Sequence, residues 1–259
     1  MPRRIAFLLT LPLLLSGCGS NSGKAPSSGS ISGNWQMSLQ KDGSTNAPRG
    51  QAGFLIQNSD MVTGGMMLTD IPCSGVGSVS GSVSGSAVSL TVNPTGVVVN
   101  LSGTIGSDQT SMSGNYTILS TGCSGSQSAP LNGTWTADLV APLTGTVQGS
   151  ITSKPHGTTF SLTGQLSQGA NTGASISSIT GNLSFTGYCY TTATVLGSIS
   201  GTSVALDLVN SDGTEIGQIT GTASLDGTSL TGTYAIRGLG AGASQDCVDG
   251  DSGTVTLAL

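Results

Sequence analysis

The amino-acid sequence predicts an all-β protein with two tandem antiparallel meander β-barrels, or two sandwiches made of the same strands. Three observations support this fold class: a glycine-rich composition with little charge, apolar residues that alternate with small or polar ones, and a long internal repeat. Of the 259 residues, 41 are glycine, 7% are charged and 4% are aromatic. Helical bundles and coiled coils need Ala, Leu, Glu and Lys at helical spacing, so this composition excludes them.

The chain begins with the features of an exported protein. Two arginines precede an apolar run over residues 5–15, and Ser-Gly-Cys18 follows it. A basic segment, a short apolar segment and small residues before a cut are typical of a secretory signal peptide. The apolar run is too short to span a bilayer, which needs about 20 residues. Residues 1–17 are therefore predicted to be a signal peptide.

The Leu-Ser-Gly-Cys sequence that ends at Cys18 resembles the lipobox of bacterial lipoproteins. This resemblance implies that the Cys18 thiol is diacylated, that the signal is cut just before it, and that the new amino group is acylated. Two or three acyl chains hold a protein on a membrane stably. Gly19 stands where many inner-membrane lipoproteins have an aspartate, which implies the outer membrane, on its periplasmic or surface face. Residues 18–30 are then the lipidated cysteine and a flexible Gly/Ser tether.

Four further cysteines predict two disulfide bonds. An even number of cysteines in an exported chain is typical of disulfides, and four of them allow three pairings. The internal repeat favours Cys73 with Cys123 and Cys189 with Cys247. In the chain-entropy model each bond would stabilise the fold by about 4 kcal/mol. A zinc site fits poorly, because the sequence has no C-x-x-C pair and a single histidine.

An internal repeat divides the rest of the chain into two units. The matched pairs are Trp35 with Trp135, Leu90 with Leu206, and Tyr116 with Tyr234, at offsets of 100, 116 and 118 residues. Two insertions explain the different offsets. The repeat is much longer than the 20–30 residues of β-solenoid coils, which excludes a solenoid.

Residues 31–130 are predicted as the first β unit and residues 131–259 as the second. The boundary is open by about ten residues, because the segment around Trp135 also resembles the last segment of the chain, Gly253–Leu259. The segment around Trp135 either closes the first unit or opens the second.

Within each unit, apolar residues alternate with small or polar ones. Val88, Leu90 and Val92 follow this period of two, which indicates half-buried strands. Turn sequences such as Asn210–Gly213 separate the runs, as hairpins require. About seven or eight strands in each unit predict a closed barrel or a sandwich.

A Gly-x-Trp opening strand followed by a Gly-x-Tyr strand resembles avidin-type and lipocalin-type barrels. The resemblance is strongest in Leu230-Thr-Gly-Thr-Tyr234, which is similar to a strand motif of the avidins. It implies the barrel architecture alone, because the extra disulfide and the shortage of aromatic residues depart from the avidin ligand pocket.

One segment is similar to a catalytic motif. Gly250-Asp251-Ser252-Gly253 is similar to the nucleophile motif of trypsin-like serine proteases, and His156 and Asp207 complete the chain order His, Asp, Ser. The sequence around His156 does not match that family, and Ser252 is too close to the C-terminus for the strands that follow the nucleophile. A tight turn before the last strand is predicted instead, with His156 in an exposed turn.

No metal or cofactor site is predicted. Asp246, Asp249 and Asp251 lie close together in sequence, but their spacing does not match a calcium-binding D-x-D-x-D-G loop, so solvated turn carboxylates are expected. No phosphate-binding glycine motif is present. Trp35 and Trp135 are expected to be core residues rather than sugar-stacking platforms.

The charge balance excludes nucleic acid as a partner. Seven basic residues against twelve acidic ones give a net charge of −5, with no basic patch to neutralise phosphates. These features predict a lipid-anchored, non-catalytic envelope protein with a structural or adhesive role, since its many hydroxyls suit glycans or envelope polymers. The alternative is a carrier that holds a small apolar ligand in a barrel lumen, which would need a cavity of about 300 Å³ or more.

Overall fold

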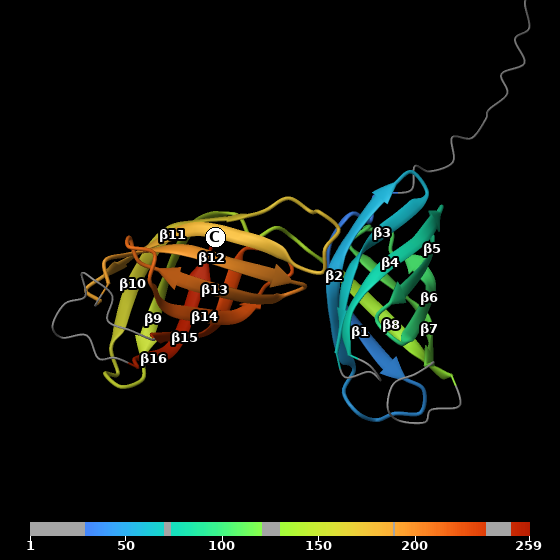
Figure 1. Ribbon diagram of the computed structural model, residues 1–259, viewed down its shortest axis with the longest axis horizontal. Helices are drawn as coiled ribbons and strands as arrows, with labels where there is room; N and C mark the ends of the chain where they lie inside the picture. The colour runs from blue at the N-terminus through green and yellow to red at the C-terminus, as the bar shows by residue number, and fades with distance from the viewer. Residues whose placement is uncertain (1–28, 70–73, 121–129, 189, 237–249) are drawn as a thin grey trace, which may run out of the picture.

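The computed structural model describes residues 29–69, 74–120, 130–188, 190–236 and 250–259. Every element in these residues is a β-strand, and the strands form two closed antiparallel barrels in chain order (Figure 1). The predicted all-β fold with two tandem meanders is confirmed, and both units are barrels rather than sandwiches. In the described part of the chain there is no helix that is long and apolar enough to cross a membrane.

All five cysteines lie outside the described residues. The lipidation of Cys18 and the two disulfide bonds, Cys73 with Cys123 and Cys189 with Cys247, therefore stay predictions.

Eight strands make up the first barrel, and each pairs with the next along the chain. They are β1 (Gly33–Lys41), β2 (Arg49–Asn58), β3 (Met61–Leu68), β4 (Gly75–Ser84), β5 (Ala87–Asn93), β6 (Val97–Ile105), β7 (Ser111–Ser120) and β8 (Leu131–Val140). The barrel closes where β8 pairs with β1, with Trp35 opposite Leu139 and Leu39 opposite Trp135.

The second barrel repeats this order with eight more strands. They are β9 (Gly145–Ser153), β10 (Thr159–Gln168), β11 (Ser177–Thr186), β12 (Thr192–Ser200), β13 (Ser203–Val209), β14 (Glu215–Ala223), β15 (Ser229–Ile236) and β16 (Ser252–Ala258). Here β16 pairs with β9, so neither barrel leaves an open edge.

Inward-facing apolar side chains fill each barrel. On β5, Val88, Leu90 and Val92 are buried while the residues between them face outward, as the period of two predicts. Trp35 and Trp135 are fully buried in the first barrel, which confirms that they are core residues. The indole N–H of Trp35 donates to the carbonyl of Ile31 at 2.8 Å, so its one polar group is satisfied.

The boundary between the units lies later than residue 130. Strand β8 hydrogen-bonds to β1 and β7, so residues 131–140 close the first barrel and do not open the second. Without β8, strands β1 and β7 would each present an unpaired edge. The connection between the barrels is therefore the segment 141–144.

The match between Trp35 and Trp135 is wrong as a repeat equivalence, because the two residues lie on the first and last strands of one barrel. The structural counterpart of Ile31 is Leu143, and both are fully buried. The N–H of Ile31 donates to Gln57 Oε1, and the N–H of Leu143 donates to Gln168 Oε1, each at 2.9 Å. The true repeat therefore starts 112 residues apart, with β9 as the counterpart of β1.

The two barrels meet end to wall. Figure 1 shows one end of the second barrel against the side of the first, at β1 and β2. Asn34 on β1 is 3% exposed, and its amide donates to the carbonyl of Gly201 and accepts from the Gly201 N–H, both at 2.8 Å. The side chain of Phe54 on β2 points out of the first barrel and packs into the apolar core of the second. This contact covers one end of the second barrel.

Two more polar contacts support the same interface. Gln36 Oε1 accepts from the Thr202 N–H at 3.1 Å and from its hydroxyl at 3.2 Å. Asn171, in the β10–β11 loop, donates to the carbonyl of Leu55 at 2.7 Å. The interface thus combines one aromatic anchor with hydrogen bonds to backbone groups.

Replacement Asn34→Ala should destabilise the protein, because it leaves the buried N–H and carbonyl of Gly201 without partners. We expect a loss of about 2–3 kcal/mol in the free energy of unfolding, measured with urea. The control Asn182→Ala removes an exposed amide from the outer face of β11 and should change stability by less than about 0.5 kcal/mol. Equal stability of Asn34→Ala and the wild type would show that the hydrogen bonds of Asn34 contribute nothing.

Candidate functional site

The far end of the second barrel, opposite the interface, gathers aromatic side chains. Tyr188, in the β11–β12 loop, lies 4.9 Å from Phe160 and 5.9 Å from Phe185 between ring centroids. It also meets Tyr234 of β15 edge-on at 6.3 Å. The chain has few aromatic residues, and these four lie together along one side of a polar cluster.

That cluster is centred on Asp251, which immediately precedes β16 and is 2% exposed. One carboxylate oxygen accepts from the hydroxyl of Ser153 at 2.8 Å. The other accepts from the phenol of Tyr188 and, at 3.0 Å, from the phenol of Tyr234. Three hydroxyls from different elements therefore satisfy the carboxylate, as burial of a polar group requires. The expectation that Asp251 is a solvated turn residue is wrong, because these segments enclose it.

Among the described residues, this cluster occurs in the second barrel and not in the first. Ser153 lies opposite Gly253 across β9 and β16, and the same position in the first barrel is Lys41, opposite Gly133. Asp251 precedes Gly253 by two residues, where the first barrel has Leu131. The tyrosine is kept in both barrels. The two copies thus share a framework and differ in the chemistry at this end.

The cluster favours neutral phenols beside the carboxylate. Burial, and then the hydrogen bond to Asp251, raises the pKa of Tyr234 to about 12. The same two causes, in the same order, raise the pKa of Tyr188 well above its ordinary value. Both phenols therefore remain hydrogen-bond donors over the physiological range, and the cluster holds the start of β16, the end of β9 and the β11–β12 loop together.

The protease-like residues do not form a triad. Ser252 lies at the start of β16 and His156 in the exposed β9–β10 turn, as predicted, but Asp207 is on β13, three strands from β16 around the barrel. Asp207 accepts instead from the Gln218 amide at 2.8 Å. The arrangement lacks the charged partner that would orient His156.

Calcium ligands are not assembled in the described residues either. Asp246 and Asp249 lie outside them, and Asp251 is occupied by hydroxyl donors. No group of three metal-ligating side chains occurs in the ranges that the structure describes.

The outer wall beside the cluster carries ordered hydroxyl groups. Two rows of cross-strand neighbours run over β14, β15, β16, β9 and β10, and all but the half-buried Ser150 are exposed. The first row is Thr220, Thr233, Thr254, Thr152 and Thr159, and the second is Thr222, Thr231, Thr256, Ser150 and Ser161. Adjacent strands are about 4.8 Å apart, so hydroxyls recur at close intervals across the wall. None of the ten side chains is charged.

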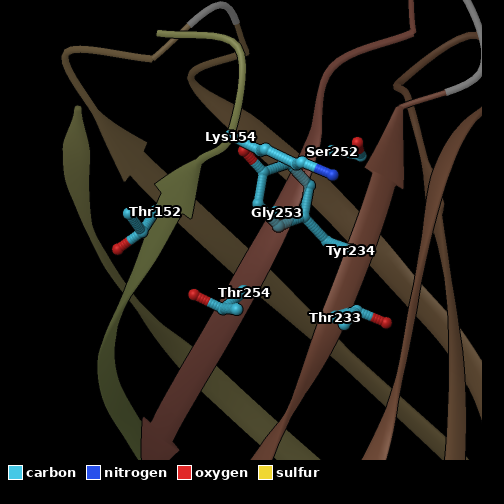
Figure 2. A pocket seen from close by; sticks show the side chains of 7 residues that line it. All are labelled: Thr152, Lys154, Thr233, Tyr234, Ser252, Gly253 and Thr254. Carbon is cyan, nitrogen blue, oxygen red and sulfur yellow. The ribbon is translucent and has the colours of Figure 1, made fainter. Parts of the chain in front are cut away.

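A groove of about 480 Å³ lies on this wall, next to the cluster (Figure 2). Thr254 lies between Thr152 and Thr233 along the first row, and Lys154 reaches across the top of the groove toward Ser252. Gly253 has no side chain, so the ring of Tyr234 closes the back of the groove. The groove thus joins hydroxyls, one ammonium group and an aromatic edge.

The first barrel has a weaker version of this wall. Its second row reads Thr104, Ser113, Thr136 and Ser38 across β6, β7, β8 and β1. A smaller hollow of about 210 Å³ lies on β6, β7 and β8, and Asp138 is among the residues that line it. Hydroxyl rows are therefore common to both copies, whereas the lysine-bordered groove belongs to the second.

Sequence reasoning missed Tyr188, Ser153 and Lys154 as site residues. The available signal was the Tyr and Phe content of residues 160–190, which exceeds that of the matching part of the first unit. This signal could not be interpreted from sequence, because it depends on contacts with Asp251. Tyr188 is 63 residues and Ser153 is 98 residues from Asp251 along the chain.

Replacement Asp251→Ala should destabilise the second barrel, because three hydroxyls lose a charged acceptor. We expect a loss of about 2–4 kcal/mol in the free energy of unfolding, measured by urea denaturation. Asp60→Ala, at an exposed turn of the first barrel, is the control and should have little effect. A loss no larger than that of Asp60→Ala would contradict the stabilising role of the cluster.

The tyrosines should make the fold sensitive to alkali. The folded pKa of Tyr234, about 12, is above the unfolded value of about 10. The stabilisation from the neutral phenol is then complete below pH 10 and is lost as the pH rises toward 12. In Tyr234→Phe the free energy of unfolding should fall less steeply than in the wild type as the pH rises across this range. Denaturation at fixed urea and varied pH measures this. An unchanged pH dependence would show that Tyr234 titrates normally.

Comparison with known proteins assigns no family. No protein-family model matches the chain, and no curated protein matches its sequence. Among solved structures, kievitone hydratase from Nectria haematococca aligns over 90% of this chain and 90% of its own, with 9% identity and a TM-score of 0.25. Similarity at this level establishes neither a shared activity nor a shared site, so function has to be inferred from the residues themselves.

Proposed function

We propose that this protein is a lipid-anchored lipoprotein of the bacterial cell envelope whose two barrels have a non-catalytic, adhesive or structural role. The observation that carries the proposal is the ordered hydroxyl wall of the second barrel. Exposed hydroxyls both donate and accept hydrogen bonds, so they suit glycans and other polyhydroxylated envelope polymers. The lipobox-like sequence at Cys18 supplies the anchor.

The surface chemistry supports a polymer partner over nucleic acid. Between β14 and β10 the two hydroxyl rows contain no charged residue, and the whole chain has a net charge of −5. Binding to such a wall depends on hydrogen bonds and shape rather than on the release of counterions. The rows follow the curved barrel, which favours a flexible chain over a flat, rigid surface.

A carrier role has less support. Buried side chains pack against one another through each lumen, including Trp35 and Trp135 in the first barrel and Ile151 and Leu206 in the second. A ligand in either lumen would have to displace these side chains. The groove that does exist lies on an outer wall.

The non-catalytic role is likewise part of the proposal. Ser252, His156 and Asp207 lack the arrangement of a nucleophile, a base and an orienting acid. Asp251 is buried and hydrogen-bonded to three hydroxyls, so its evident role is to hold the end of the barrel together.

Labelling and envelope binding test the proposal together. Cells given radioactive palmitate should label the wild-type protein and not Cys18→Ser, whereas Cys73→Ser should retain the label. Detergent-solubilised full-length protein should then sediment with lipid-free cell-wall material. Absence of label would exclude the anchor, and failure to sediment with any envelope fraction would exclude the adhesive role.

A further inference from the structure

We propose that the groove formed by β15, β16 and β9 binds a sugar that carries one acidic group. This inference rests on the proposed function and names the chemistry of its partner. The groove has two chemically different parts, a floor of threonine hydroxyls and a rim with a single cation, and each selects a different part of the ligand (Figure 2).

The floor offers hydroxyls that are available for a ligand. Thr152 and Thr233 each share a hydrogen bond with a neighbouring threonine, at 2.9 Å and 3.4 Å. Thr254, between them, has no side-chain hydrogen bond to any residue that the structure describes. A free hydroxyl between two partly satisfied ones can both donate to and accept from the hydroxyls of a sugar ring.

Among the residues that the structure describes, the rim provides one positive charge without a competing acid; Asp246 and Asp249 lie outside them. The structure gives Lys154 no ion pair within the described ranges, and its ammonium group reaches over the groove toward Ser252. The nearby carboxylate of Asp251 is buried and accepts from three hydroxyls, so it is engaged elsewhere. A carboxylate or phosphate on the ligand would therefore form a charge-assisted hydrogen bond with Lys154.

The backbone of Lys154 is held by the fold. Its backbone N–H donates to the carbonyl of Ser252 at 2.8 Å, which holds the two sides of the rim together. Beneath it, the Asp251 cluster fixes Ser153 and Tyr234. The site is thus built on a rigid barrel end, which lowers the ordering cost of binding.

Size and composition agree with a sugar ligand. The groove volume of about 480 Å³ lies within the usual range for small-molecule sites, about 300–1,000 Å³. Threonine methyl groups provide apolar surface for the faces of a sugar ring, and Tyr234, which is 3% exposed, closes the groove from behind. Rows of threonine also stabilise strands by themselves, but strand pairing does not require a hollow, or a lysine above it that has no ion pair to any described residue.

Calorimetric titration of the detergent-solubilised full-length protein tests the inference. The probes are galacturonic acid and neutral galactose, which differ in a single carboxylate, and glucose 6-phosphate with glucose for a phosphorylated sugar. We expect one acidic member to bind about tenfold more tightly than its neutral partner, with the difference decreasing at high salt. The pair that shows it identifies the acid as carboxylate or phosphate.

Two variants separate the parts of the groove. Lys154→Gln should abolish the preference for the acidic sugar. Thr254→Val, which keeps the side-chain shape, should weaken the binding of the acidic and the neutral sugar alike, by about three- to tenfold. Matched controls are Lys41→Gln on the first barrel and Thr180→Val on β11, which should bind as the wild type does.

Two outcomes would overturn the inference: no binding of any probe, or an acid preference that survives in Lys154→Gln. If no probe binds but the protein sediments with cell-wall material, the proposed function is retained and this groove is excluded as its site. Binding of the acidic probe without sedimentation would instead support the groove and count against the adhesive role.

Discussion

The structure depends on the closure of two hydrogen-bonded rings of strands. A chain with few charges and many glycines has little side-chain surface with which to cover an exposed sheet edge. Pairing of β8 with β1, and of β16 with β9, removes those edges by joining the last strand to the first. Once each ring is closed, its inward residues form the core, and its outward residues are free to be small and hydroxylated.

Much of the fold could be predicted from the sequence because closure leaves a local pattern. Val88, Leu90 and Val92 alternate with small residues, and the Tyr116 and Tyr234 strands recur at one offset. The domain boundary could not be read in the same way, because β1 and β8 share a Gly-x-Trp pattern for a reason other than duplication. They are neighbours in one barrel and face the same core.

The candidate site was much harder to predict. Asp251 looks like an ordinary turn carboxylate in sequence, since the residues that bury it are far away along the chain. Tyr188 and Ser153 reach it only because β9 is next to β16 in the closed ring and the β11–β12 loop folds over the same end. Divergence between the barrels gives the clearest indication of function: Leu131 and Lys41 in one copy correspond to Asp251 and Ser153 in the other. The two copies share a scaffold and differ at this end.

The contact of one barrel end with the wall of the other also has a mechanical consequence. The described chain starts on the first barrel, and the candidate site lies at the opposite end of the second. A load applied between these points crosses from one barrel to the other through the short segment 141–144 and, in parallel, through the contacts of Asn34 and Phe54. Because those contacts share the load with the covalent segment, we expect the two barrels to move as one rigid body rather than as two domains joined by a flexible linker.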